Sequence, residues 1–351
     1  DSAAAFEGFK GGLYTFRSEN SSKQWATSYD FASIESGHVV KTELPDGNLA
    51  MAQAYVFNLR REKFQDRRVR EALAMMFNFE WSNAQLFYGL YERVQSFWGN
   101  SELEAKGAPT PGERAVLQPL VDQGLLSADI LTDEAVMAPV SGARQLDRKN
   151  LRRASQLMDE AGWRVNSDGM REKAGQVFTL EVLDSSPAFD RITNPMIENM
   201  KALGIDARLN RVDTAQESER TRAYDFDVTT HSMRMSFEPS SGLEQYFGTK
   251  AMDQSSRNLM GLSDPAVDAL IEKTVRAQSK AELNTNIHAL DRVLRAKRFW
   301  IPQWFKAVHT VAYYDQYGYP DPLPPFARGE LDFWWFDADK AAKLKAAGVL
   351  N

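Results

Sequence analysis

Short apolar runs alternate along the chain with amphipathic segments of helical period. Residues 54–58 read Ala-Tyr-Val-Phe-Asn, and such an uninterrupted run is typical of a strand buried on both faces. Further strands are predicted at 178–183 and 205–209 with a helix at about 190–203 between them, and another helix leads to a strand at 226–230. Strands that alternate with such helices need crossover connections, so we expect an α/β fold with an at least partly parallel sheet.

Several other segments carry apolar residues at helical spacing. Val69, Leu73, Met76 and Phe77 would share one face of a core helix that begins at about Asp66. The other helices expected are 6–12, followed by a strand at 13–17, then 151–161 stopped by Gly162, a helix entered through 263–265, 283–294 and 338–347.

Turn and breaker residues divide these elements. Asp168-Gly169 predicts a hairpin at 166–169, because this pair tolerates the positive φ of a tight turn. Residues 100–147 hold many of the prolines and several glycines, so we expect an irregular insertion with short helices there.

Composition narrows the class of protein. The 351 residues are 43% hydrophobic and 26% charged, carry a net charge of −6 and include no cysteine. A chain of this size can bury the cores of two lobes, and the lack of a basic patch argues against a nucleic-acid partner. No apolar stretch is long enough to span a bilayer. The N-terminus lacks a signal-peptide pattern, so we expect any export signal to lie outside this sequence.

Motifs for catalysis and for metal or cofactor binding are absent. No nucleophile elbow, phosphate loop or dinucleotide fingerprint occurs. The four histidines are too far apart in sequence to suggest a metal motif. We therefore predict no enzyme activity, no metal and no cofactor. The histidines are His38, His231, His288 and His309.

Aromatic residues are concentrated between Phe299 and Phe336, Trp304 and Phe326 among them. Rings in a cleft can stack on a ligand. For any single ring, however, a place in the core is the simpler interpretation.

Four segments, in their order along the chain, resemble the dipeptide- and oligopeptide-binding family of bacterial extracellular solute-binding proteins, family 5. Each segment alone is weakly specific, and their order carries the resemblance. Three shorter motifs further resemble the branch that handles oligopeptides and microcin C-like peptide-nucleotides. The segments are 4–12, 55–58 with 64–73, 157–163 and 257–271, and the branch motifs are 17–27, 78–81 and 86–89.

This resemblance implies a two-lobe fold like that of type II periplasmic binding proteins, here with the first lobe incomplete. Family members carry a large N-terminal portion ahead of the point where this sequence begins, so the chain would be the C-terminal part of such a protein. Residues 1–50 and 296–351 would belong to the first lobe, and 51–295 would form the second. A ligand would be enclosed between the lobes by hinge closure.

The resemblance also implies a function. The protein would be the periplasmic component of an ABC importer in a Gram-negative bacterium, capturing an oligopeptide or a peptide-like conjugate and delivering it to the membrane permease. We expect it to act as a monomer, without nucleic acid and without inserting into the membrane. An oligosaccharide ligand stays open, because rings with scattered polar groups suit it as well.

The ligand-anchoring mode departs from the family. In its peptide binders an aspartate after the strand that matches 226–230 holds the free amine of the peptide, and here residues 231–240 contain no aspartate. Glu238 could substitute, or Arg234 could bind a carboxylate or phosphate. Ion pairs at Arg234 and Arg257, and a hinge or cap role for Asn58, are alternatives. The expected ligand-binding residues are Glu19, Asn20, Trp25, Asn58, His231, Arg234, Ser236, Glu238, Arg257, Asn258 and Trp304.

Two other classes of function remain open from the sequence alone. A ligand-sensing domain of a regulator can use this fold, and a DNA-binding segment elsewhere in the protein would reveal it. An enzyme on the same scaffold would turn over its ligand, whereas a carrier would return it unchanged.

Overall fold

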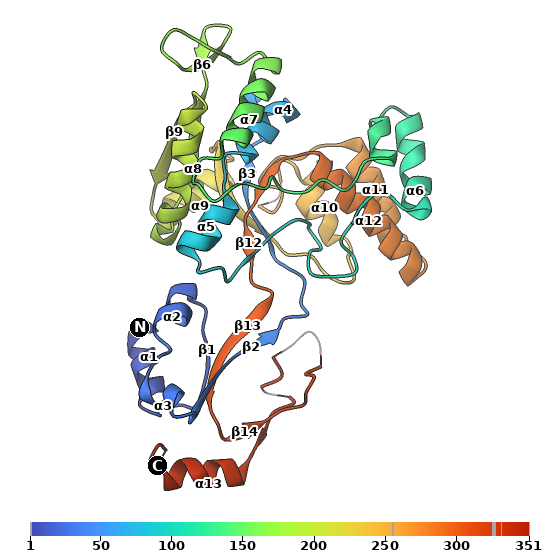
Figure 1. Cartoon of the computed structure of the whole chain (residues 1–351). Helices are drawn as coiled ribbons and strands as arrows, with labels where there is room; N and C mark the ends of the chain where they lie inside the picture. Colours follow the sequence, from blue (N-terminus) through green and yellow to red (C-terminus); the bar gives the residue numbers. More distant parts are fainter. Residues whose placement is uncertain (1, 255, 325–327, 331, 351) are drawn as a thin grey trace. The chain divides into compact units, whose positions relative to one another are not determined.

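A computed structural model describes residues 2–254, 256–324, 328–330 and 332–350, and the chain divides into two compact units (Figure 1). Unit 1 consists of Asp1–Asn48, Asn83–Glu92 and Lys306–Asn351, and unit 2 of Leu49–Ser82 and Arg93–Phe305. Each unit has a hydrophobic core of its own.

A five-stranded mixed sheet, in the order β11-β3-β10-β8-β9, forms the centre of unit 2. The pairs β10–β8 and β8–β9 are parallel, which confirms the partly parallel sheet expected from the sequence, whereas β3 runs antiparallel to both β10 and β11. The strands are β3 (Ala52–Phe57), β8 (Thr179–Asp184), β9 (Asp206–Arg211), β10 (Val228–Met233) and β11 (Trp300–Pro302).

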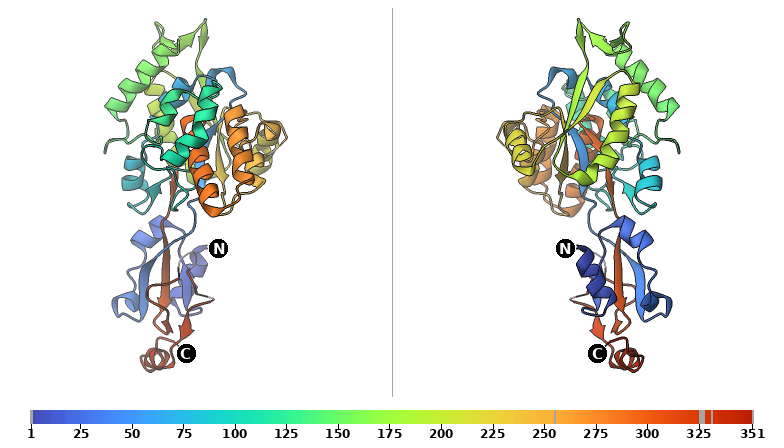
Figure 2. Two further views of the ribbon diagram at one scale, coloured as in Figure 1. Left: turned by 90° about the vertical axis from the view of Figure 1, so that its right-hand side faces the viewer. Right: turned by 90° about the vertical axis from the view of Figure 1, so that its left-hand side faces the viewer.

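Strand β3 is buried on both faces, as its apolar run predicts. Ala54 and Val56 belong to the core that α11 (Pro265–Val275) and α12 (Lys280–Ala296) complete. Tyr55 points the other way, and its hydroxyl hydrogen-bonds the Thr193 hydroxyl of α8 (Asp190–Ala202) at 2.8 Å. Helices therefore cover both faces of the sheet (Figure 2).

Helix α4 (Arg67–Ala74) is shorter than its apolar period suggests, because the helix predicted to include Met76 and Phe77 ends before them. Both side chains are nevertheless buried. The helix ends early because Asn78 begins a new one, α5 (Phe79–Leu86). The Asn78 Oδ1 accepts from the Trp81 N–H at 2.8 Å and so caps the start of α5.

The insertion at 100–147 contains α6 (Pro111–Asp122) and the 3₁₀ turn η2 (Ala128–Leu131), in agreement with the expected short helices. Buried arginines of α12 bond the irregular backbone of this insertion. Arg292 pairs with Glu113 at 2.8 Å and donates to the Gly107 carbonyl, and Arg295 donates to the Ala105 carbonyl at 2.7 Å. Side chains, rather than a sheet or helix ladder, thus satisfy these carbonyls.

A hairpin follows α7 (Arg148–Glu160) at the predicted position. The N–H of Asn166 donates to the Met170 carbonyl at 2.8 Å, and Gly169 has φ of 80°. The small antiparallel sheet around it consists of β5 (Arg164–Val165), β6 (Arg171–Lys173) and β7 (Gln176–Val177).

The remaining elements of unit 2 are η1 (Glu62–Phe64), η3 (Pro187–Phe189), α9 (Thr214–Arg222), α10 (Gly242–Phe247), η4 (Thr249–Ala251) and β12 (Trp304–Phe305). The short strand β4 (Glu92–Arg93) lies at the boundary of this unit.

Unit 1 is built on an antiparallel sheet in the order β1-β13-β2. The strand expected at 13–17 begins only at Phe16, because the turn that closes the first helix extends to Leu13. The Leu13 N–H donates to the Gly8 carbonyl, and Gly12 has φ of 72°. Its elements are α1 (Ser2–Lys10), β1 (Phe16–Ser18), α2 (Ser22–Thr27), α3 (Ala32–Glu35), β2 (Val39–Pro45), β13 (Val308–Tyr314), β14 (Tyr317–Gly318), β15 (Trp335–Phe336) and α13 (Ala338–Ala346).

Candidate ligand-binding site

Polar and aromatic side chains gather at the carboxyl end of β10, in unit 2. The ring of His231, in the second half of this strand, lies 6.5 Å from the ring of Tyr246 on α10. The guanidinium of Arg257 lies over the same tyrosine ring at 5.3 Å, and the Arg234 N–H donates to its hydroxyl at 3.4 Å. Tyr246 thus brings three of the predicted residues together. In open α/β sheets, ligands bind at the carboxyl ends of parallel strands.

The surroundings of His231 favour the neutral form of its ring. Burial lowers its pKa below the usual 6.5, and the hydrogen bond from Nε2 to the Arg257 carbonyl, at 2.9 Å, opposes part of that shift. Because a carbonyl can only accept, Nε2 carries the proton and Nδ1 remains an acceptor.

The loop after β10 exposes charges of both signs. Arg234, Ser236 and Glu238 are all exposed. The loop is fixed at Ser236, whose Oγ accepts from the Glu238 N–H at 3.1 Å and whose carbonyl accepts from Trp98 Nε1 at 3.2 Å. A guanidinium and a carboxylate on one loop could meet an anionic and a cationic group of a ligand.

Two predicted asparagines have side chains that the fold already uses. Asn58 is fully buried and donates from Nδ2 to the carbonyls of Tyr224 and Phe226 at 2.8 and 2.9 Å. It lies at the amino end of β10, away from His231. Asn258 is also fully buried, and its amide bonds the Leu262 backbone through both Oδ1 and Nδ2.

The predicted residues of unit 1 lie around its small core. Glu19 is buried and accepts from Arg17 at 3.0 Å, from the Tyr29 hydroxyl at 3.1 Å and from the Ser21 N–H at 2.9 Å. Trp25 is buried too, and its Nε1 donates to Glu43 at 3.1 Å. Asn20 is exposed.

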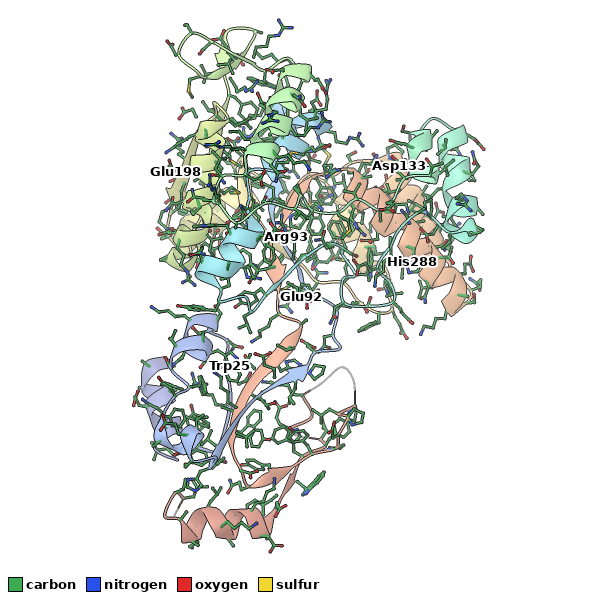
Figure 3. All side chains as sticks on the ribbon, viewed as in Figure 1. Trp25, Glu92, Arg93, Asp133, Glu198 and His288 are labelled. Atoms are coloured by element: carbon green, nitrogen blue, oxygen red, sulfur yellow. The ribbon has the colours of Figure 1, made fainter. Side chains whose placement is uncertain are left out.

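Trp304 takes part in an aromatic group in unit 2 that also includes Phe77 and Phe189, with ring centroids at 6.3 and 5.8 Å from its own. Phe326, in the same aromatic part of the sequence, lies outside the described residues. One residue that no sequence motif indicated lies against Phe77. It is Arg93, a buried arginine whose guanidinium is 4.9 Å from this ring (Figure 3).

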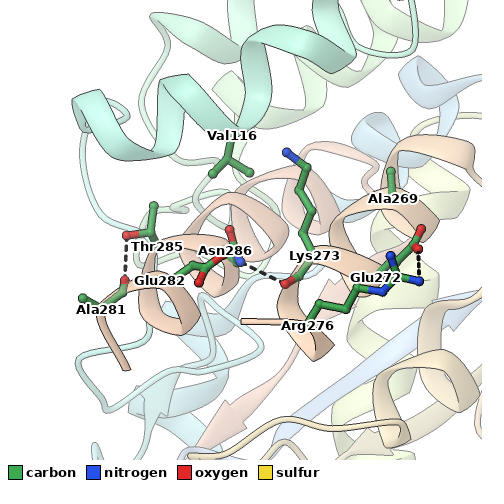
Figure 4. A pocket seen from close by; sticks show the side chains of 9 residues that line it. All are labelled: Val116, Ala269, Glu272, Lys273, Arg276, Ala281, Glu282, Thr285 and Asn286. Atoms are coloured by element: carbon green, nitrogen blue, oxygen red, sulfur yellow. Dashed lines mark hydrogen bonds and ion pairs between the residues drawn. The ribbon is translucent and has the colours of Figure 1, made fainter. Parts of the chain in front are cut away.

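A hollow of about 670 Å³ opens between α6, α11 and α12 (Figure 4). Its walls carry exposed charged groups such as the Arg276–Glu272 ion pair at 2.8 Å, with side chains 77% and 58% exposed. Ligand pockets are mostly apolar with a few convergent polar groups, so we assign no ligand to it. The hollow is lined by Val116, Ala269, Glu272, Lys273, Arg276, Ala281, Glu282, Thr285 and Asn286.

The described part of the chain contains no group of three or more histidine, cysteine or acidic residues that could hold a metal ion. Among the same residues no helix is both long and apolar enough to cross a membrane.

Residues 1–254 match the family model described as bacterial extracellular solute-binding proteins, family 5 Middle. The chain belongs to this family. The resemblance seen in the ordered segments is thereby confirmed.

Curated relatives and solved structures agree with family 5. The chain is 40% identical over 339 residues to the probable peptide-binding protein YejA of Agrobacterium fabrum, covering 95% of the chain and 55% of that protein. It is 33% identical to YejA of Escherichia coli, over 99% of the chain and 57% of that protein. The chain therefore spans about half the length of the curated relatives it matches.

The fold is that of a solved family member. The oligopeptide-binding protein AppA of Bacillus subtilis, in complex with a nonapeptide, superposes with a TM-score of 0.67 at 16% identity, over 96% of the chain and 58% of AppA. This likeness shows the type II periplasmic binding protein fold expected from the sequence.

Proposed function

We propose that the protein containing this chain is the solute-binding component of an ABC importer, located in the periplasm of a Gram-negative bacterium. It would capture an oligopeptide or a peptide-like conjugate and deliver it unchanged to the membrane permease. It would work as a monomer, because a carrier has to present its ligand-binding lobes to the transporter.

Family membership and the cluster at the carboxyl end of β10 support this proposal. His231 and Arg257 lie at Tyr246 together with the start of an exposed loop, and the rings and hydrogen-bonding groups suit a ligand that has both apolar and polar parts. The name of the A. fabrum relative, a probable peptide-binding protein, points to the same class of ligand.

Within the predicted set of residues, we propose that Arg234, Ser236 and Glu238 contact the ligand directly, since their side chains are exposed on the loop. His231 and Arg257 would flank that contact, and Asn20 of unit 1 and Trp304 of unit 2 are further proposed ligand-binding residues. Glu19, Trp25, Asn58 and Asn258 make hydrogen bonds within the chain, so a ligand contact by any of them would be added to a structural role.

Native mass spectrometry of the full-length protein, purified gently from its host, tests the proposal. We expect a co-purified peptide or peptide conjugate whose mass stays constant on incubation. Arg234→Gln should reduce the bound fraction, whereas Arg276→Gln, a change at an exposed ion pair outside the cluster, should leave it unchanged. A bound mass that breaks down into smaller products would show an enzyme instead.

A further inference from the structure

Five arginines of the described chain are buried, and one of them differs from the rest. Arg70 donates to the carbonyls of Gln65 and Lys297 at 2.9 and 2.6 Å. Arg171, Arg292 and Arg295 likewise bond backbone carbonyls or acids. Buried guanidinium groups are thus bonded in this fold, as the free energy of burying a charge requires.

Arg93 is the exception. Its side chain is as buried as that of Arg70, with 8% and 7% of the two residues exposed. Yet Nε, Nη1 and Nη2 of Arg93 have no hydrogen-bond partner in the described part of the chain. Phe77 and Phe79 face the guanidinium with their rings, at 4.9 and 5.6 Å, which compensates the charge in part but satisfies none of its N–H groups.

No acid of the described chain neutralises Arg93 by direct contact. Glu80 attracts the guanidinium electrostatically, but its carboxylate accepts from the Ser141 N–H at 3.0 Å and forms no ion pair with Arg93 among the described residues. The five N–H groups of the fork are therefore left for another acceptor.

A second buried side-chain donor lies at Gln303, the residue between β11 and β12. The Val94 N–H bonds the Gln303 carbonyl at 3.1 Å, which places Gln303 beside the residue that follows Arg93. The side chain of Gln303 is fully buried, and its Oε1 accepts from Gln53 at 2.7 Å. Its Nε2 interacts with the Tyr55 hydroxyl but completes no hydrogen bond of good geometry in the described chain. Trp304 follows directly, with its ring against Phe77.

We propose that Arg93 is a ligand-anchoring residue. Its guanidinium receives an oxygen anion of the peptide-like ligand, a carboxylate or a phosphate, with the Gln303 amide as a further donor and the Phe77 and Trp304 rings beside the adjoining part of the ligand. The planar fork of arginine matches either anion through two parallel hydrogen bonds. The inference rests on the proposed carrier function and adds the chemistry of one ligand group.

Isothermal titration calorimetry on the full-length protein tests this anchor. The probes are short alanine peptides as free acids, the same peptides as C-terminal amides, and amides that carry a phosphoserine. We expect the wild-type protein to bind an anionic form at least about tenfold more tightly than the plain amide, the effect of a charged hydrogen bond. A preference for the free acid identifies a carboxylate, and one for the phosphoserine amide identifies a phosphate.

Arg93→Gln should abolish that preference, because it should lower the affinity for the anionic peptide and leave the affinity for the plain amide unchanged. Arg93→Lys keeps the charge without the planar fork and should retain a small part of the preference. This variant replaces Arg93→Gln in the test if the glutamine variant does not fold. Arg70→Gln is the matched control, since Arg70 is equally buried but fully bonded. It should lower the melting temperature and leave the preference intact.

Two results separate the inference from the function on which it rests. If the peptides bind but Arg93→Gln keeps the full preference, or if the wild type has none, the anchor is refuted and the carrier stands. If the wild type binds none of the peptides, peptide carriage and the anchor are both refuted.

Discussion

At the scale of single residues, the most consequential side chains in unit 2 are buried charges. Glu113 and Arg292 are almost fully buried and joined by two hydrogen bonds at 2.8 and 3.0 Å. Burying such a pair gains little net free energy, but removing one partner leaves the other charge without compensation. The pair therefore fixes where the insertion packs on α12.

Replacing Arg292 with methionine should lower the free energy of unfolding by about 3–5 kcal/mol, because it leaves the Glu113 carboxylate buried without its arginine partner. Urea unfolding measures the change. Arg276→Met breaks an exposed pair on α11 and should have a far smaller effect. Equal losses in the two variants would mean that burial does not determine the strength of these pairs.

Secondary-structure elements were predictable where a local signal sets their ends. The Ser-Asp-Pro entry at 263–265 correctly predicts the start of α11, because the cap is formed by neighbours in sequence. The end of α4 was missed, since Asn78 stops it by capping the next helix, and the apolar period continues through Phe77. Apolar spacing indicates which residues are buried, and residues both within α4 and after it are buried. It does not indicate where the helix ends.

The cap of α11 offers a test at this scale. Oδ1 of Asp264 accepts from the N–H groups of Ala266 and Val267 at 3.0 and 3.2 Å, and its carboxylate also pairs with Lys297. Asp264→Ala should cost about 1 kcal/mol of stability, or somewhat more with the ion pair lost. Asp264→Asn preserves the cap and should recover most of the loss in a thermal melt. No recovery would place the stabilisation in the ion pair instead.

For the molecule as a whole, the α/β class and the family follow from order along the sequence, whereas the candidate site depends on tertiary contacts. The sequence selected His231, Arg234 and Arg257 because of the strand and segment they follow, and the structure brings them together at Tyr246. Arg93 could not be selected in this way. That its guanidinium lacks a hydrogen-bond partner among the described residues is visible only from the tertiary structure.

A core substitution in one unit should destabilise that unit and not the other, because their hydrophobic cores have no residue in common. Phe9 is fully buried in unit 1, and Leu290 is fully buried in unit 2. Phe9→Ala should cost about 3–5 kcal/mol and Leu290→Ala about 2–5 kcal/mol, each within its own unit. Amide hydrogen exchange should then rise in 39–45 and 308–314 for the first variant, and in 228–233 for the second. Faster exchange in both units from either change would show that they unfold as one cooperative body.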